Sequence, residues 1–238
     1  MRDTRERILD AAERLFGELG YEATSLRTVT AQAGANIAAV NYHFKSKEGL
    51  LRAALARRFR PINDQRLTLL DAYEKERGTA APRVEDLVRI LLAPLLVMGS
   101  DSGPQAAGLK MFFGRMYAEP TRNIHRVFFQ EMKDVVGRFA AAFQRAMPSL
   151  PPVEIYWKIH FSIGATAHTL VGATLLETMS GGLCDPHDYQ AAVERLIAFV
   201  VGGLKAPPLA HVGKGGSRIS EPSHVSQGKQ NRIRSLPR

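Results

Sequence analysis

Between Asn36 and Lys47 the chain carries amide, hydroxyl, imidazole and ammonium side chains and no carboxylate. Small residues stand among these hydrogen-bonding groups, so that a helix carrying them could approach a groove closely. Amides pair with base edges, methyl groups contact thymine, and hydroxyl and imidazole groups donate hydrogen bonds to phosphates. This combination indicates contact with double-stranded DNA. The outward-facing residues of the stretch are Ala38, Ala39, Asn41, Tyr42 and His43.

Two short helices joined by a tight turn are predicted to position this surface. Thr24 or Ser25 can cap the first helix, and Gly34 suits the left-handed position after its end. Ser46 can cap a third helix that begins at once. The apolar stripes of the two short helices can face one small core, which is the arrangement of a helix-turn-helix. The stripes consist of Leu26, Val29, Ala33, Ile37, Val40 and Phe44.

Contacts to DNA are expected from both short helices and from the first turn of the next helix, where backbone N–H groups favour a phosphate. The alternative is an ordinary helical hairpin packed inside a larger domain. Tyr42 and His43 beside Lys45 and Lys47 argue against it, because such a cluster is unusual in a buried interface. The expected DNA-contact residues are Ser25, Arg27, Thr28, Asn36, Ala38, Ala39, Asn41, Tyr42, His43 and Lys47.

Residues 5–55 resemble the DNA-binding domain of the TetR family of bacterial transcription regulators. The matching residues are Leu9-Asp10-Ala11-Ala12, Leu15-Phe16, Gly20-Tyr21, Thr24, Val29, Ala33-Gly34, Val40, Tyr42-His43-Phe44, Lys47 and Leu50-Leu51. The resemblance implies a homodimer, an all-helical effector domain and ligand-controlled release from an operator. Residues 36–44 resemble a subgroup that includes fatty-acid-responsive regulators, and residues 150–154 and 157–161 extend that similarity. A repressor released from a palindromic operator by an apolar effector, such as a fatty acid or acyl-CoA, is therefore expected.

The composition is typical of a globular protein: 45% of the 238 residues are hydrophobic and 23% are charged. Cys184 is the single cysteine, so an internal disulfide is excluded and a reducing compartment is expected. The N-terminus lacks the apolar segment of a secretory signal. The longest uncharged run, residues 159–176, contains histidine, serine and threonine, which are costly against lipid, and is expected to be a buried helix. We expect a cytoplasmic protein without a membrane partner.

The net charge of +9 is unevenly distributed. Residues 1–60 carry 11 Lys/Arg against 7 Asp/Glu, residues 61–206 carry 15 of each, and residues 207–238 carry 6 against 1. The basic ends fit regions that approach a polyanion, whereas the neutral middle must have another role. Arg2, Arg5 and Arg7 could reach phosphates or could form a solvated first turn.

An all-α fold is predicted, because the alternation typical of strands does not appear. Its parts are an N-terminal three-helix helix-turn-helix domain over residues 1–50, a larger helical ligand-binding and dimerisation domain over residues 51–206, and a basic disordered tail over residues 207–238. Pro61 is expected to kink or break the long helix over residues 47–76. The other expected helices span residues 4–19, 84–98, 105–118, 121–146, 153–179 and 185–204.

Small residues in the expected helix 153–179 and an apolar surface on the last helix indicate a four-helix dimer interface. The alternative is that both helices fill the core of a monomer. The family resemblance favours the dimer. The expected dimerisation residues are Gly164, Ala165, Gly172, Ala198 and Val201.

Methionine and phenylalanine between residues 109 and 161 suit an adaptable apolar pocket, because thioether chains repack around flexible ligands. The same residues could equally be plain core. Arg115, His160 or His168 could pair with a ligand carboxylate, unless a neighbour already satisfies the side chain. The expected ligand-binding residues are Met111, Phe112, Arg115, Met116, Phe129, Trp157, Phe161 and His168.

Residues arranged for catalysis do not stand out, and neither a metal nor a cofactor is expected. Cys184 and His187 have a spacing that could suggest a metal, but Asp185, Pro186 and Asp188 explain that stretch as a helix start. Residues 213–217 match a phosphate-binding loop only in part. Two alternatives stay open: a multidrug-type regulator that responds to aromatic or cationic compounds, and a helical lipid-binding protein or enzyme with a vestigial DNA-binding head.

Overall fold

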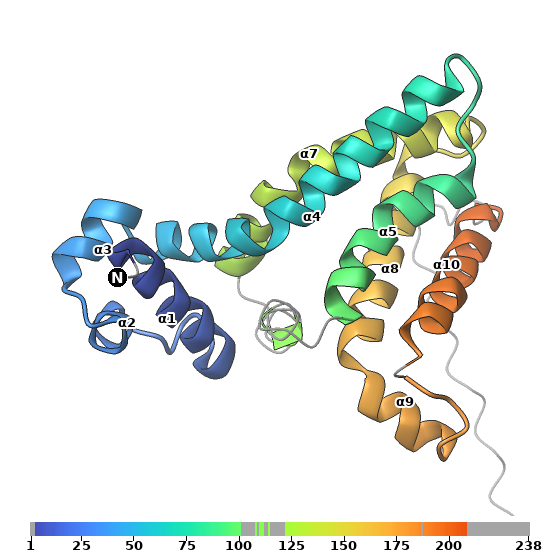
Figure 1. The fold of residues 1–238 in the computed structure, drawn as a ribbon. Helices are drawn as coiled ribbons and strands as arrows, with labels where there is room; N and C mark the ends of the chain where they lie inside the picture. The colour runs from blue at the N-terminus through green and yellow to red at the C-terminus, as the bar shows by residue number, and fades with distance from the viewer. Residues whose placement is uncertain are drawn as a thin grey trace, which may run out of the picture. The chain divides into compact units, whose positions relative to one another are not determined.

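The computed structural model describes residues 3–100, 108, 110–111, 114, 122–186 and 188–208, and these form only helices and the turns between them (Figure 1). The predicted all-α fold is confirmed for this part of the chain. Most of the expected helix 105–118 and the tail from residue 209 onward lie outside the described residues. The helices are α1 (Thr4–Leu19), α2 (Leu26–Ala33), α3 (Ile37–Phe44), α4 (Lys47–Arg77), α5 (Val84–Ser100), α7 (Arg122–Ala146), α8 (Pro152–Val171), α9 (Ala173–Ser180) and α10 (Tyr189–Lys205).

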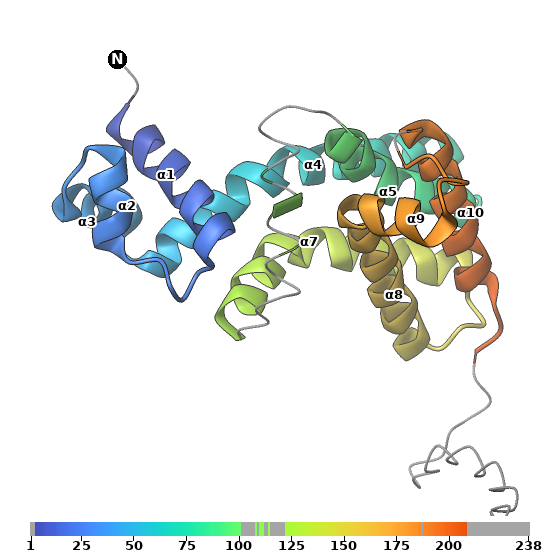
Figure 2. The same cartoon turned by 90° about the horizontal axis from the view of Figure 1, so that it is seen from below.

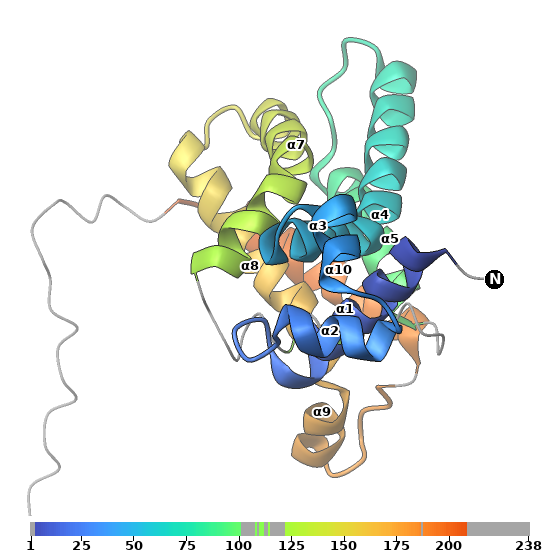
Figure 3. The same cartoon turned by 90° about the vertical axis from the view of Figure 1, so that its left-hand side faces the viewer.

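The first three helices pack around one small core (Figures 1 and 3). Local interactions set their ends: the Ser25 hydroxyl caps α2, and Gly34 follows α2 with φ 58°. Thr24, the other candidate for the cap, is buried and donates its hydroxyl to the carbonyl oxygen of Gly20 at 2.7 Å. A side-chain cap contributes about 1 kcal/mol, so these boundaries follow from the local sequence. The buried residues of this core include Ile8, Leu9, Ala12, Phe16, Val29, Val40 and Phe44.

The fourth helix, α4, is 31 residues long and packs against α1, α5 and α7. Figure 1 shows it alongside α7. Pro61 was expected to kink or break the helix; it lies inside α4 without ending it, so the break does not occur. The missing N–H of Pro61 removes the helical hydrogen-bond donor for the carbonyl oxygen of Arg57. Because α4 begins at Lys47, it crosses the domain boundary expected at residue 50 as one continuous helix.

The helices α5, α7, α8 and α10 pack around a further part of the core, which is continuous with that of the first three helices. Near the start of α8, the ammonium of Lys158 donates to the carbonyl oxygens of Gly203 at 2.7 Å and Ala206 at 3.0 Å, at the end of α10. The other end of α8 lies near the start of α10, so the two helices are antiparallel. Fully or almost fully buried side chains of this core include Leu87, Val127, Phe139, Phe143 and Ile155.

The single helix expected over residues 153–179 is wrong, because the chain forms two helices there, α8 and α9. They meet at Gly172 with a bend of 79° (Figure 2). A Cβ atom on Gly172 would lie 2.7 Å from the carbonyl oxygen of His168, so the bend depends on a residue without a side chain. The last helix also starts later than expected: Asp188, rather than Asp185, caps α10 by accepting a hydrogen bond from the backbone of Ala191 at 3.1 Å.

The uncharged run over residues 159–176 is buried on one side only, contrary to expectation. Ile159 and Thr166 are buried, whereas Phe161, Val171 and Leu175 are exposed. Within the described residues, no single helix has the length and hydropathy of a membrane span, although the bent pair of α8 and α9 meets both criteria when taken together.

Replacement of Gly49 by alanine should lower the free energy of unfolding by about 1–3 kcal/mol. A Cβ atom at this position would lie 2.0 Å from the carbonyl oxygen of Phe44, a backbone atom at the junction of α3 and α4. Gly137→Ala in α7 is the control, because no heavy atom lies within 4 Å of its Cβ position. This control should gain about 0.5–1 kcal/mol from helix propensity. Urea denaturation followed by circular dichroism measures both, and an unchanged Gly49→Ala midpoint would contradict the prediction.

Candidate functional site

One side of α3 is exposed and carries small and hydrogen-bonding residues. Ala38, Asn41 and Tyr42 are exposed, and Tyr42 keeps 74% of its surface accessible. His43 is partly buried, with its ring edge-on to the Tyr42 ring at a centroid distance of 4.9 Å. On the opposite side, Phe44 is buried in the core. The exposed side of α3 therefore combines a smooth approach surface with an amide and a hydroxyl at its tips.

Two of the expected DNA-contact residues already serve as helix caps. The Ser25 hydroxyl accepts a hydrogen bond from the backbone of Thr28 at 3.0 Å and lies 2.8 Å from the Thr28 hydroxyl. The Asn36 side chain accepts a hydrogen bond from the backbone of Ala39 at 2.8 Å, and the Ala39 side chain packs partly against the core. Arg27 is exposed beside the first cap. The caps orient α2 and α3, and they leave the amide group of Asn36 and the guanidinium of Arg27 at the surface.

Two lysines follow α3, and they differ in their contacts. The ammonium of Lys47 donates to the carbonyl oxygen of Glu22 at 3.2 Å and lies 4.4 Å from the centroid of the Tyr21 ring. Lys45 is exposed, has a φ of 68°, and donates to the carbonyl oxygen of Tyr42 at 3.2 Å. A positive φ is strained for a residue with a Cβ. The turn therefore holds a cation beside Tyr42, and Lys45 joins the candidate surface although it was not among the expected DNA-contact residues.

An ion-pair cluster joins α1 to α4. The guanidinium of Arg57 contacts the carboxylates of Glu6 at 3.0 Å, Asp10 at 2.8 Å and Glu13 at 2.6 Å, and Arg58 also pairs with Glu13. The hydrogen bond to Glu13 is the largest cause that raises the pKa of Arg57 above its ordinary value. The α1 helix is thus tied electrostatically to the first third of α4.

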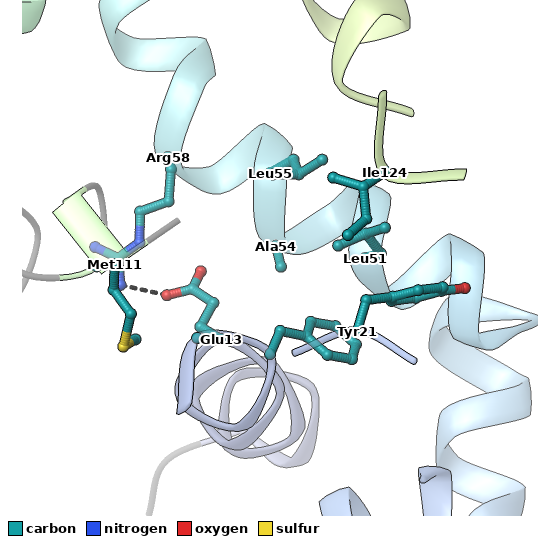
Figure 4. Close-up of a pocket in the computed structure, with 11 residues that line it drawn as sticks. Glu13, Tyr21, Leu51, Ala54, Leu55, Arg58, Met111 and Ile124 are labelled. Atoms are coloured by element: carbon teal, nitrogen blue, oxygen red, sulfur yellow. Dashed lines mark hydrogen bonds and ion pairs between the residues drawn. The ribbon is translucent and has the colours of Figure 1, made fainter. Parts of the chain in front are cut away.

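A small cavity of about 50 Å³ lies next to this cluster (Figure 4). The pair formed by Arg58 and Glu13 borders it, as does Met111, which was expected in the ligand pocket. A cavity of this size has room for only a few water molecules, so it is too small for an effector. The labelled lining residues are Glu13, Tyr21, Leu51, Ala54, Leu55, Arg58, Met111 and Ile124.

Polar contacts also join the start of α4 to α7. Arg126 pairs with Glu48 at 2.7 Å, and Arg52 donates to the side-chain oxygen of Gln130 at 3.0 Å. These contacts lie directly after the helix-turn-helix. A displacement of the start of α7 would therefore also displace the start of α4, which directly follows α3.

The larger candidate ligand site is a cavity of about 240 Å³ between α4, α5, α7 and α8. Its lining is mainly aromatic and aliphatic, which suits an apolar molecule. Exposed side chains among the lining residues, such as Phe129 and Tyr156, mark where it opens between α7 and α8. The lining residues are Phe59, Arg66, Leu91, Leu92, Leu95, Phe128, Phe129, Met132, Val135, Val136, Phe139, Tyr156, Ile159, His160, Ile163 and Thr166.

Arg66 of α4 lines this cavity, and it was missed in the sequence. It is 6% exposed, its Nε donates to the carbonyl oxygen of Leu91 at 2.7 Å, and its Nη1 donates to the side-chain oxygen of Asn63 at 3.2 Å. Burial lowers the pKa of Arg66 to about 10. The signal in the sequence is a charged residue at helical spacing between the apolar residues Phe59 and Leu70.

The structure does not gather the residues expected in the ligand pocket at one site, and Met111 lies at the small cavity described above. Phe129 lines the larger cavity, and so does His160, one of the polar candidates. Trp157, Phe161 and His168 do not line it and are exposed on α8, where the rings of Trp157 and Phe161 stack at a centroid distance of 5.6 Å. Three expected residues lie outside the described part of the chain: Phe112, Arg115 and Met116.

The residues expected at a dimer interface all keep part of their surface accessible in the single chain: Gly164, Ala165, Gly172, Ala198 and Val201. Large apolar side chains are exposed on the same two helices, namely Trp157 and Phe161 on α8 and Phe199 on α10. Phe161 is 63% exposed and Phe199 is 71% exposed. The helices α8 and α10 are antiparallel neighbours. We call these expected interface residues and exposed aromatic residues together the α8–α10 face.

Within the described residues, no group of three or more His, Cys, Asp or Glu side chains could hold a metal ion. Cys184 is exposed, and His187 lies outside the described residues.

Two models of known protein families match this chain. Residues 8–54 match bacterial regulatory proteins of the tetR family, and residues 89–203 match the tetracyclin repressor-like C-terminal domain. The first match covers most of α1, all of α2 and α3 and the start of α4, and the second covers most of α5, all of α7, α8 and α9 and most of α10. Together the two matches span more than half of the chain.

The chain is also similar to individual regulators. It is 32% identical over 133 residues to the HTH-type transcriptional dual regulator CecR of Shigella flexneri, over 53% of this chain and 56% of CecR. The chain spans about half the length of the curated relatives that it matches first. The SmeT–triclosan complex superimposes with a TM-score of 0.59 and 21% identity, over 88% of this chain and 100% of that one.

A further solved structure, the regulator FadR of Bacillus subtilis in complex with stearoyl-CoA, gives a TM-score of 0.53 at 15% identity, over 83% of this chain and 98% of FadR. At such identities the likeness of the solved structures concerns the fold alone. The two family matches, the all-helical fold and the exposed side of α3 all point to a helix-turn-helix regulator. The chain belongs to the TetR family of bacterial regulatory proteins.

Proposed function

We propose that this chain is a homodimeric transcriptional repressor that leaves a palindromic operator when an apolar effector fills the larger cavity. The observation that carries the proposal is the course of α4. This one helix follows α3 directly, contacts α7 through Glu48 and Arg52, and lines the cavity with Phe59 and Arg66. From Lys47 to Arg66 the helix is about 28 Å long, at 1.5 Å per residue.

The exposed side of α3 is proposed to enter the major groove. Asn41 has the amide group that pairs with a base edge, and Ala38 is small enough for close approach. Tyr42 and Lys45 are proposed to donate hydrogen bonds to phosphates, which position the protein without reading sequence. The absence of carboxylates from Asn36 to Lys47 avoids repulsion from the phosphates.

A second copy of the chain is proposed to cover the α8–α10 face. Burial of a large apolar side chain stabilises an assembly by about 1.5–3 kcal/mol, and Trp157, Phe161 and Phe199 are all exposed in the single chain. A two-fold dimer sets two copies of α3 against one DNA face, where palindromic half-sites lie about 34 Å apart. Because the two copies of α3 are related by a two-fold axis in such a dimer, the operator is expected to be a palindrome.

The effector is proposed to be a lipid, either a fatty acid or an acyl-CoA. The cavity lining offers Phe128, Met132 and Phe139 to an apolar chain. An effector shifts the protein between two arrangements only if it binds one of them more tightly. A change in the distance between α4 and α7 around the effector would reach the helix-turn-helix through Arg52 and Arg126.

Two other functions receive less support. A multidrug-type regulator for aromatic cations would need a carboxylate in its pocket, and none lies among the described lining residues of the cavity. The family match favours a regulator over an enzyme or lipid carrier with a vestigial head.

Asn41→Ala and Tyr42→Ala should affect DNA binding in different ways. Loss of a base contact should cost about 1–3 kcal/mol and reduce the preference for the operator over a scrambled duplex. Loss of the Tyr42 hydroxyl should weaken binding to both duplexes alike, because phosphates carry no sequence. Fluorescence anisotropy with a selected palindrome and its scrambled form measures this. Lys75→Ala at the far end of α4 is the control, and equal affinities of all variants for both duplexes would refute the assignment of α3.

Phe161→Glu should convert the dimer into a monomer, because a charge on the α8–α10 face would have to be desolvated on association. Analytical ultracentrifugation of the full chain measures the mass of the species. Leu69→Glu is the matched control, since Leu69 is an exposed apolar residue of α4 outside this face. A parent chain that sediments as a monomer, or a Phe161→Glu variant that stays dimeric, would contradict the proposed interface.

Titration of the protein–operator complex with fatty acids and with acyl-CoAs should lower DNA affinity for one of the two sets. A coupling free energy of about 1–3 kcal/mol corresponds to a loss of roughly 5–150-fold. A gel shift at constant salt measures it, with glycerol and free coenzyme A as controls that lack the acyl chain. DNA affinity that stays constant with both sets would remove the lipid effector from the proposal.

A further inference from the structure

The described residues that line the larger cavity include one strongly basic side chain and no acidic one. Among its described lining residues, Arg66 is the only guanidinium, and neither a lysine nor a carboxylate is present. The rest of the lining is apolar apart from Tyr156, His160 and Thr166. An apolar cavity with a single cation in its wall is chemically asymmetric. A site for a neutral hydrocarbon would not need this cation.

The internal contacts of Arg66 leave its charge unbalanced. Its Nε and Nη1 bind the carbonyl oxygen of Leu91 and the amide oxygen of Asn63, which are neutral acceptors. Asn63 is itself held in place, because its Nδ2 donates to the carbonyl oxygen of Glu131 at 3.2 Å. The described residues provide no ion pair for Arg66 and no hydrogen-bond acceptor for its Nη2. Hydrogen bonds from Nε and Nη1 therefore fix the orientation of the guanidinium, while Nη2 remains available to donate to a ligand.

Burial of this cation is unfavourable in the empty protein. Desolvation lowers the pKa of Arg66 to about 10, and no nearby carboxylate counteracts it. The group nevertheless stays protonated near neutral pH, because its pKa still lies well above 7. A buried charge without a counterion is rare, since pairing normally compensates the lost hydration. An anion that entered the cavity would supply this compensation, and the guanidinium fork matches a carboxylate.

We propose that the effector is an apolar monocarboxylic acid whose carboxylate pairs with Arg66. This inference rests on the proposed function and specifies its ligand. The carboxylate lies at the buried α4 wall, and the apolar chain extends towards the opening beside Phe129 and Tyr156. A coenzyme A thioester fits less well, because its carboxyl group is esterified and its several phosphates would need several cations. The cavity volume of about 240 Å³ also suits an acid better than a complete coenzyme A conjugate.

Isothermal titration calorimetry on the full-length chain tests the inference with three probes that share a ten-carbon chain: decanoic acid, 1-decanol and decanoyl-CoA. The acid should bind on the order of tenfold or more tightly than the alcohol, as expected for a charge-assisted hydrogen bond in a buried site. The acid should also bind more tightly than the thioester. The comparison of acid with alcohol isolates the carboxylate, because the apolar part is the same.

Arg66→Met retains an extended side chain and removes the charge. In this variant decanoic acid should no longer bind more tightly than 1-decanol. The affinity of the variant for 1-decanol should be at least as high as that of the parent. Arg60→Met is the matched control, since Arg60 is an exposed arginine of the same helix that pairs with Glu131 at 3.7 Å. This control should keep the parent's preference for the acid. A merely structural role of Arg66 would weaken both probes together.

The outcomes separate the inference from the proposed function. Equal affinity of the parent for acid and alcohol would overturn the role of Arg66 and leave an apolar effector in place. Tighter binding of decanoyl-CoA than of the acid would overturn it in favour of a thioester. Absence of binding by all three probes would reject the lipid effector itself. If Arg66→Met does not fold, as judged by circular dichroism, the comparison of probes on the parent decides.

Discussion

The packing of α4 against α1 on one side and α7 on the other is the contact on which the rest of this structure depends. Arg57 and Arg58 tie the helix to three carboxylates of α1, and Glu48 and Arg52 tie its start to α7. Because α4 is continuous, the segment that carries α3 and the wall of the larger cavity belong to the same helix. Protein interiors are close-packed, so a displacement at one point of such a helix is felt along it.

The larger cavity combines two requirements that normally oppose each other. Its aliphatic and aromatic lining excludes water, and the same dryness makes the charge of Arg66 unfavourable. The neutral hydrogen bonds to Leu91 and Asn63 orient the guanidinium without neutralising it. An uncompensated charge of this kind lowers stability unless a ligand completes the pair. The cost in the empty state is then the source of selectivity for an anion.

The exposed aromatic residues of α8 illustrate how one helix can serve two partners. Ile159 and Thr166 face the interior and line the cavity, whereas Trp157 and Phe161 face outward beside α10. Apolar surface of this size is rarely left in water by a soluble monomer. Under the proposed function, a partner on the outer side and an effector on the inner side would contact the same helix, and the geometry of the dimer would respond to the content of the cavity.

Local chemistry alone determined where α2 begins and ends and where α3 and α4 begin: the caps at Ser25, Asn36 and Ser46 and the glycine at position 34 give these boundaries. Short-range hydrogen bonds and helical periodicity require no knowledge of distant contacts, and the all-α fold followed in the same way. Tertiary packing decided the rest. The bend at Gly172 depends on close approach to His168, the outward orientation of Trp157 depends on which face of α8 meets α5 and α7, and the burial of Arg66 depends on three other helices closing over α4. The helical periodicity of apolar residues predicts that a side chain is buried. Which residues it contacts once buried depends on how the helices pack together.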